Sequence, residues 1–197
     1  MANSFLLVSL AVIECFCIFK ARKFGNDVRL RYNIFMLNEG DSNRMNSEVR
    51  ATNVVVTVLG VQRDIDGEEN AIELVTVGRY YRKNNVDYIT YQESEITGME
   101  GTATMLKIYD DHVILSRTGS VEHKQEFRLG ECCKSTYVTA YGRIEMSIMT
   151  SKLTVSFGSQ DNTVDRIDIG YELELDGHWQ SANTLSIIVR GEQKNGH

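Results

Sequence analysis

The sequence predicts an all-β protein, an antiparallel meander of about eight to ten strands closed into a β-barrel. Apolar and polar residues alternate with a period of two from about residue 54 to residue 189, with many β-branched and aromatic side chains. Turn residues interrupt this alternation roughly every 8–14 residues, and no stretch has the apolar period of an amphipathic helix. A meander must protect its edge strands, and closure removes the edges, so a barrel is favoured over a sandwich.

The first half of the alternation predicts five strands joined by short turns. Asp64-Ile65-Asp66-Gly67 is typical of a turn, and Asn84-Asn85 is typical of a tight hairpin because asparagine tolerates positive φ. The Asn84-Asn85 hairpin is the firmest local prediction in this half. The predicted strands cover 54–61, 71–82, 86–93, 102–109 and 112–117.

The second half continues the meander to the end of the alternation. Gly130, Gly142 and the pair Asp176-Gly177 mark turns. In the stretch 167–175, isoleucine, tyrosine and leucine alternate with acidic residues and one glycine, which is the pattern of a half-buried strand. The predicted strands cover 121–129, 133–139, 143–150, 152–157, 167–175 and 179–189.

Residues 1–44 differ from the rest of the chain and are predicted to lie outside the fold, leaving 45–197 as the barrel domain. They carry a net charge of +2, whereas the remainder carries −8. We consider two interpretations: translation starts at Met45, or residues 5–19 form a short membrane anchor. A helix of that length spans about 22 Å, less than the ~30 Å hydrocarbon core, and it would bury Glu14, so membrane attachment is disfavoured.

Composition restricts the partners and the compartment. The net charge of −6 argues against nucleic acid or anionic lipid as the main partner. The four cysteines form neither a metal motif nor a disulfide framework, which predicts a reducing, cytoplasmic location. The four histidines have no ligand spacing, so we expect no metal site and no cofactor.

Spaced single residues give a resemblance to a known family. They are Gly78-Arg79-Tyr80-Tyr81, Tyr88, Tyr91-Gln92-Glu93, Gly98, Thr104, Arg117-Thr118-Gly119, Gln125-Glu126-Phe127, Gly130, Tyr137 to Gly142, Thr150 and Leu153. Over about residues 50–190 the chain resembles the YwiB-like family of small bacterial proteins. The resemblance implies a calycin- or lipocalin-like β-barrel of unknown function. Ala140 is a departure, because a proline is expected before the Tyr-Gly pair.

Strand parity selects two charged residues as candidate ligand contacts. Arg117 shares a strand face with Val113 and Leu115, and Glu93 shares one with Ile89. Three interpretations remain open at this stage: both side chains lie at strand ends in solvent, they pair across the barrel lumen, or Arg117 receives a carboxylate or phosphate of a ligand.

Tyrosines are the other candidate contacts. Tyr91 and Tyr137 are predicted to bind a ligand, because an aromatic ring with a polar tip suits the mouth of a pocket. Cross-strand packing is the more common reason for tyrosine in a sheet, and it stays open as the alternative.

The functional prediction is non-enzymatic binding of a small, partly apolar ligand in the barrel. The sequence has neither a nucleophile elbow nor a phosphate-binding glycine loop, so we predict no catalytic residues. The alternative is a structural or protein-interaction barrel with a filled core, present as a homodimer. The large side chains predicted to fill such a core belong to Met105, Leu106, Met146, Met149, Phe157 and Trp179.

Overall fold

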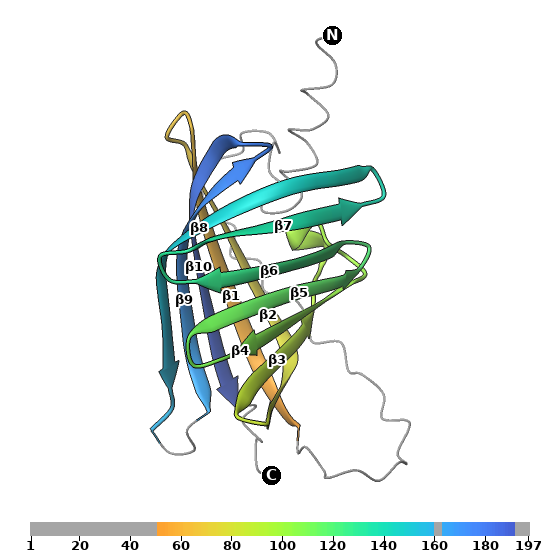
Figure 1. The fold of residues 1–197 in the computed structure, drawn as a ribbon. Helices are drawn as coiled ribbons and strands as arrows, with labels where there is room; N and C mark the ends of the chain where they lie inside the picture. Colours follow the sequence, from red (N-terminus) through yellow and green to blue (C-terminus); the bar gives the residue numbers. More distant parts are fainter. Residues whose placement is uncertain (1–50, 160–162, 192–197) are drawn as a thin grey trace.

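The computed structural model describes residues 51–159 and 163–191 of the chain. In these residues ten antiparallel strands close into a single barrel (Figure 1), which confirms the predicted fold class. The predictions for residues 1–44, including the start at Met45, lie outside the described residues. The strands are β1 (Thr52–Asp64), β2 (Glu69–Lys83), β3 (Val86–Gln92), β4 (Thr102–Ile108), β5 (His112–Gly119), β6 (Glu122–Arg128), β7 (Cys132–Thr139), β8 (Gly142–Phe157), β9 (Val164–Leu175) and β10 (His178–Gly191).

The topology is a simple meander in which each strand pairs with the next along the chain. The first and last strands then pair with each other, with Val56 opposite Val189, and this pairing closes the barrel. The shortest ladder joins β6 and β7, where only Glu122↔Val138 and His123↔Tyr137 are paired, at the end away from their connecting turn. The backbone edges along the remainder of these two strands are therefore outside the ladder.

Two predicted hairpin turns have the expected backbone. Asn84 and Asn85 have φ of 52° and 61°, and Asp176 and Gly177 have φ of 48° and 78°. Positive φ at both central residues matches the right-handed twist of the flanking strands. These turns fix the registers of β2 with β3 and of β9 with β10.

The predicted strands 143–150 and 152–157 are one strand, so that part of the prediction is wrong. β8 continues through Lys152, and its register against β9 shifts between Thr150 and Lys152. A bulge of this kind inserts an extra residue without ending the strand, and it reverses which side chains face inward beyond it. Before the bulge the even-numbered residues face inward, and Thr150 is buried. After it the odd-numbered residues face inward, and Leu153 and Val155 pack against the core.

The interior is largely filled by side chains from all ten strands, but only some of the predicted fillers take part. Leu106 and Met146 are buried. The other four were predicted wrongly: Met105 is half-buried, while Met149, Phe157 and Trp179 are exposed. Met105 and Met149 each lie directly between two inward-facing residues, so strand alternation places their side chains on the outer face.

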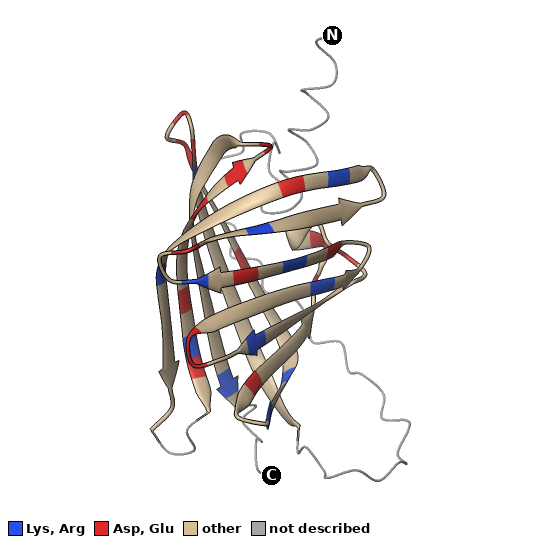
Figure 2. Ribbon diagram, in the orientation of Figure 1, with Lys and Arg blue, Asp and Glu red and all other residues tan. Residues whose placement is uncertain are grey.

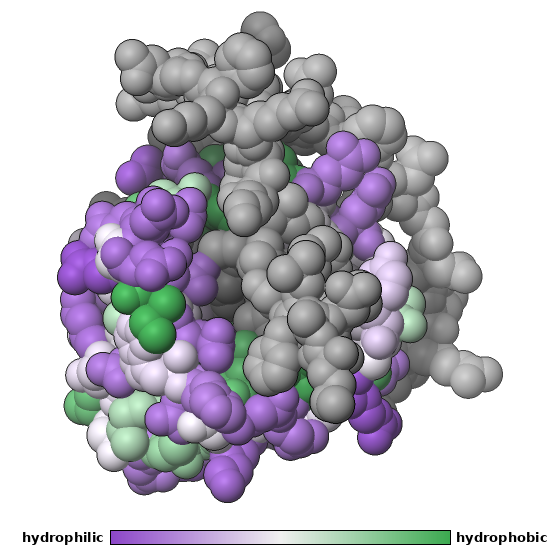
Figure 3. Space-filling view, turned by 90° about the horizontal axis from the view of Figure 1, so that it is seen from above, coloured by the Kyte–Doolittle hydropathy of each residue, from purple (hydrophilic) through white to green (hydrophobic). Residues whose placement is uncertain are grey.

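The outer surface of the described barrel carries charged residues of both signs. Figure 2 shows Lys and Arg interspersed with Asp and Glu on neighbouring strands and in the turns. Seen from above, the described residues are mostly hydrophilic, with small separate hydrophobic areas (Figure 3). Among residues 51–159 and 163–191, no helix has the length and apolar character needed to cross a bilayer.

The turn between β5 and β6 depends on a glycine at position 119. Gly119 has φ of 127°, and a Cβ there would lie 2.2 Å from the carbonyl oxygen of Gly101. Gly142 has a comparable φ of 146°, but a Cβ there would meet nothing within 4 Å. In urea unfolding we expect Gly119→Ala to lower the free energy of unfolding by about 2 kcal/mol, against about 0.5–1 kcal/mol for Gly142→Ala. Equal losses would show that the close approach to Gly101 is unimportant.

Candidate functional site

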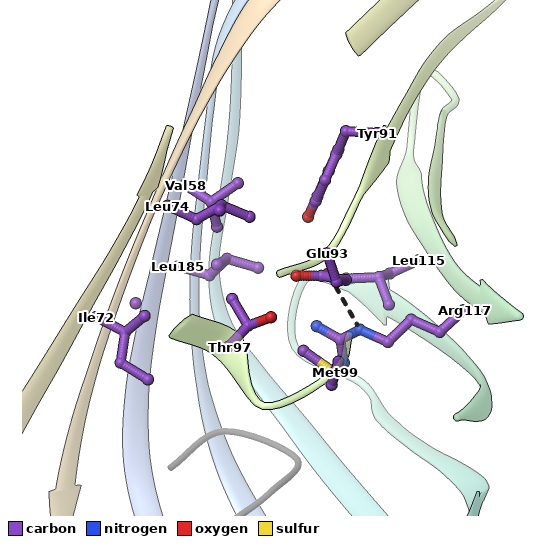
Figure 4. A pocket seen from close by; sticks show the side chains of 11 residues that line it. Val58, Ile72, Leu74, Tyr91, Glu93, Thr97, Met99, Leu115, Arg117 and Leu185 are labelled. Carbon is purple, nitrogen blue, oxygen red and sulfur yellow. Dashed lines mark ion pairs between the residues drawn. The ribbon is translucent and has the colours of Figure 1, made fainter. Parts of the chain in front are cut away.

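A cavity of about 50 Å³ lies inside the barrel between two chemically different walls. Its lining residues are Val58, Gly60, Ile72, Leu74, Tyr91, Glu93, Thr97, Met99, Leu115, Arg117 and Leu185. Figure 4 shows Val58, Leu74 and Leu185 on one side, and the side chains of Tyr91 and Arg117 on the other. The cavity therefore has an apolar wall from β1, β2 and β10 facing polar groups from β3 and β5.

The segment between β3 and β4 covers one end of this cavity. It contains the 3-10 turn η1 (Glu95–Thr97), whose N-cap Ser94 accepts a hydrogen bond from the backbone N–H of Ile96. Gly98 ends the turn in the left-handed conformation, with φ of 66°. The chain then places Met99, which is 4% exposed, against the core. Thr97 and Met99 thereby become part of the cavity wall.

Arg117 and Glu93 form a buried ion pair in the cavity. Nε of Arg117 lies 3.7 Å from Oε1 of Glu93, and the two side chains are only 7% and 2% exposed. The interpretation that both lie at strand ends in solvent is therefore wrong, because the segment between β3 and β4 covers them. The two residues do pair, as the second interpretation held, but along one wall of the barrel and not across the lumen: Glu93 directly follows β3, Arg117 lies on β5, and β4 lies between these strands.

Two hydroxyl groups complete the polar side of the cavity. The hydroxyl of Thr104 donates a 2.5 Å hydrogen bond to Oε1 of Glu93, which fixes the orientation of the carboxylate. Thr104 also hydrogen-bonds with Tyr91. Burial raises the pKa of Tyr91 above its ordinary value, and the nearby Glu93 raises it further, so the phenol stays neutral at physiological pH.

The strand register extends this polar group into a row across five strands. Tyr91 on β3 faces Thr104 on β4, which faces Arg117 on β5; Arg117 faces His123 on β6, which faces Tyr137 on β7. All five side chains are buried. Buried polar groups are costly unless they are hydrogen-bonded, so a continuous polar row inside a barrel is a candidate functional feature.

His123 is the first member of a chain of hydrogen bonds between β6 and β7, next to their short ladder. Its Nε2 lies 3.1 Å from the hydroxyl of Ser135, and that hydroxyl donates to Oε1 of Gln125 at 2.6 Å. The amide nitrogen of Gln125 in turn donates to the carbonyl of Glu126 at 2.7 Å. The hydroxyl of Ser135 has one proton, which it donates to Gln125, so it accepts a hydrogen bond from His123. The neutral imidazole therefore carries its proton on Nε2, and Nδ1 is unprotonated.

His123 is neutral at physiological pH. Burial lowers its pKa to about 3, and the charge of Arg117 adds to this effect. Its ring meets the ring of Tyr137 edge to face, with centroids 5.3 Å apart. The histidine is therefore an uncharged member of the polar row.

The structure brings together three of the four predicted ligand contacts. Arg117, Glu93 and Tyr91 line the cavity, whereas Tyr137 lies in the same polar row but packs against His123 outside the lining. Ligand binding by these four residues stays a prediction. The parity argument that selected Arg117 and Glu93 placed both side chains on the inward face, and both are buried.

Sequence reasoning missed His123, Gln125 and Ser135. The available signal was parity, because His123 and Gln125 share a strand face with Phe127. The polar neighbours of these residues concealed that face. Among residues 51–159 and 163–191, no cluster of histidine, cysteine and carboxylate side chains could hold a metal ion.

The fold and the site define a closed antiparallel β-barrel whose internal cavity combines an apolar wall with a buried ion pair. The chain belongs to the family described as "Domain of unknown function (DUF1934)", whose model matches residues 56–187.

A relative and a solved structure agree with this assignment. The chain is 27% identical over 140 residues to the "Uncharacterized beta-barrel protein YwiB" of Bacillus subtilis (strain 168), a match that covers 71% of this chain and 94% of the relative. It also resembles the crystal structure of the ywiB protein from Bacillus subtilis, with a TM-score of 0.61 and 23% identity. That match covers 73% of this chain and 94% of the crystallised chain, and it confirms the fold.

Proposed function

We propose that the protein binds a small, partly apolar molecule in the barrel cavity and does not transform it. The observation that carries this proposal is the cavity itself, where Val58, Leu74 and Leu185 face the Arg117–Glu93 pair. Ligand sites are typically concave and mostly apolar, with a few polar groups that orient the ligand. The apolar wall would hold the alkyl part of the molecule, and the polar wall would orient its head.

The expected calycin-like character of the barrel supports the same function. Small antiparallel barrels of this type are either filled by side chains or hold one small ligand. A volume of about 50 Å³ is well below that of an engineered cavity that binds benzene, about 150 Å³. The ligand, or the part of it enclosed here, therefore has only a few heavy atoms.

A structural, homodimeric barrel is the second candidate. It is favoured by two exposed apolar residues on the outer faces of adjacent strands, Leu59 on β1 (41% exposed) and Val75 on β2 (57% exposed). A purely structural function does not explain why Arg117 and Glu93 are buried inside the barrel, so ligand binding is the better-supported proposal.

Native mass spectrometry of the full chain, purified from a bacterial host under mild conditions, tests the proposal. We expect additional mass that disappears on denaturation. Val58→Phe should abolish this additional mass because the larger ring occupies the cavity. Val75→Phe, on the outer face of the barrel, should retain it. A bare dimer mass for the unmodified protein would instead favour the structural barrel.

A further inference from the structure

We propose that the cavity selects an electrically neutral ligand whose polar head both accepts and donates hydrogen bonds, as a primary amide does. This inference rests on the proposed ligand-binding function and specifies the class of ligand. Its basis is the charge composition of the cavity lining, which in the described part of the chain contains one cation and one anion, 3.7 Å apart.

The two charges compensate each other within the site. A ligand carboxylate that approaches Arg117 must also approach Glu93, so repulsion by the carboxylate opposes attraction by the guanidinium. A ligand cation meets the same conflict with the signs reversed. Either ion also loses its hydration on burial, and no net charge in the cavity compensates that loss. A neutral ligand avoids this cost.

The remaining titratable groups of the polar row leave this charge balance unchanged near neutral pH. Tyr91 keeps its proton because burial and the adjacent Glu93 raise its pKa. His123, which faces Arg117 across the strands, stays uncharged because burial lowers its pKa to about 3. The site therefore presents a strong local dipole without net charge.

The polar wall offers both hydrogen-bonding functions at once. The guanidinium of Arg117 is a donor only, and the carboxylate of Glu93 is an acceptor only. Figure 4 shows both groups on the same side of the cavity, with their ion pair marked. A primary amide matches this arrangement, because its carbonyl accepts and its NH₂ group donates. An alkyl substituent on the amide would face the wall formed by Val58, Leu74 and Leu185.

Three isosteric probes separate charge from shape: acetamide, acetate and acetamidinium, each with a planar head and one methyl group. Each is titrated at pH 7 into full-chain protein with methionine labelled in the ¹³C-methyl group. Met99 lines the cavity and reports binding, whereas the exposed Met149 reports non-specific effects. We expect acetamide to shift the Met99 signal with a dissociation constant at least about tenfold lower than that of either ion.

The outcomes distinguish the inference from the proposed function. Tighter or equal binding of acetate or acetamidinium at Met99 would overturn the neutral-ligand inference while supporting binding in the lumen. A Met99 signal that no probe shifts would contradict the proposed function itself, and the inference would fall with it.

Charge variants extend the test. Glu93→Gln keeps an acceptor for Thr104 and gives the site a net positive charge, so acetate should gain at least about tenfold over acetamide. The double variant Glu93→Gln/Arg117→Gln restores neutrality and should again prefer acetamide. An unchanged order of affinities in Glu93→Gln would overturn the inference. The probe series on the unmodified protein decides the question if the single variant does not fold.

Discussion

Arg117→Met is expected to destabilise the barrel by about 3–5 kcal/mol, measured as the free energy of unfolding in urea. The substitution leaves the Glu93 carboxylate buried without its cation, although the hydroxyl of Thr104 still donates a hydrogen bond to it. The double variant Arg117→Met/Glu93→Gln removes both charges. It should therefore be more stable than Arg117→Met and lie within about 1 kcal/mol of the unmodified protein.

An exposed ion pair provides the matched control for these variants of the buried pair. Arg63 and Glu69 lie 2.5 Å apart, but their side chains are 63% and 56% exposed. Arg63→Met should cost less than about 1 kcal/mol, because water screens both charges. A similar small loss for Arg117→Met, with no coupling to Glu93, would contradict the buried pair.

The free energy of unfolding is expected to decrease below pH 6.5 because of His123. Burial lowers the pKa of this histidine from 6.5 to about 3 in the folded protein. Between these two values the unfolded chain binds a proton that the folded chain does not bind, so stability is full above pH 6.5 and decreases as the pH falls. The contribution is about 1.4 kcal/mol per pH unit, or about 3 kcal/mol between pH 6.5 and pH 4.

Comparison with variants isolates this contribution from that of the carboxylates. His123→Gln keeps a nitrogen donor near Ser135 and removes the titrating group, so its stability should depend less steeply on pH over this range. His178→Asn alters an exposed histidine and should keep the original dependence. An imidazole NMR signal of His123 that titrates near pH 6.5 in the folded protein would refute the prediction.

Much of the fold could be predicted because strand alternation is a local property. Apolar neighbours such as Ile89 and Leu115 identify the inward face of their strands, and the same parity places Glu93 and Arg117 on that face. The interpretation that these two residues are solvated at strand ends failed for a non-local reason. Their burial depends on the segment that contains Met99, and its position over the barrel end is not encoded in the alternation itself.

A bulge caused the wrong placement of Trp179. The register of β10 against β9 shifts between Trp179 and Ser181, so parity counted back from Asn183 places Trp179 on the wrong face. Its indole N–H instead donates to Glu172, which is exposed. A bulge changes parity after a single extra residue, and alternation alone does not reveal where that residue lies.

Closure by the first and last strands has a consequence for how the protein is made. Val54 pairs with Gly191, so these contacts join opposite ends of the described chain. During synthesis, β1 can pair with β10 only after almost the whole chain has left the ribosome. Pairings between such distant residues form slowly because the intervening chain must first be ordered. Until then, the strand edges of β1 and of the latest strand made are both open to other chains in the cell.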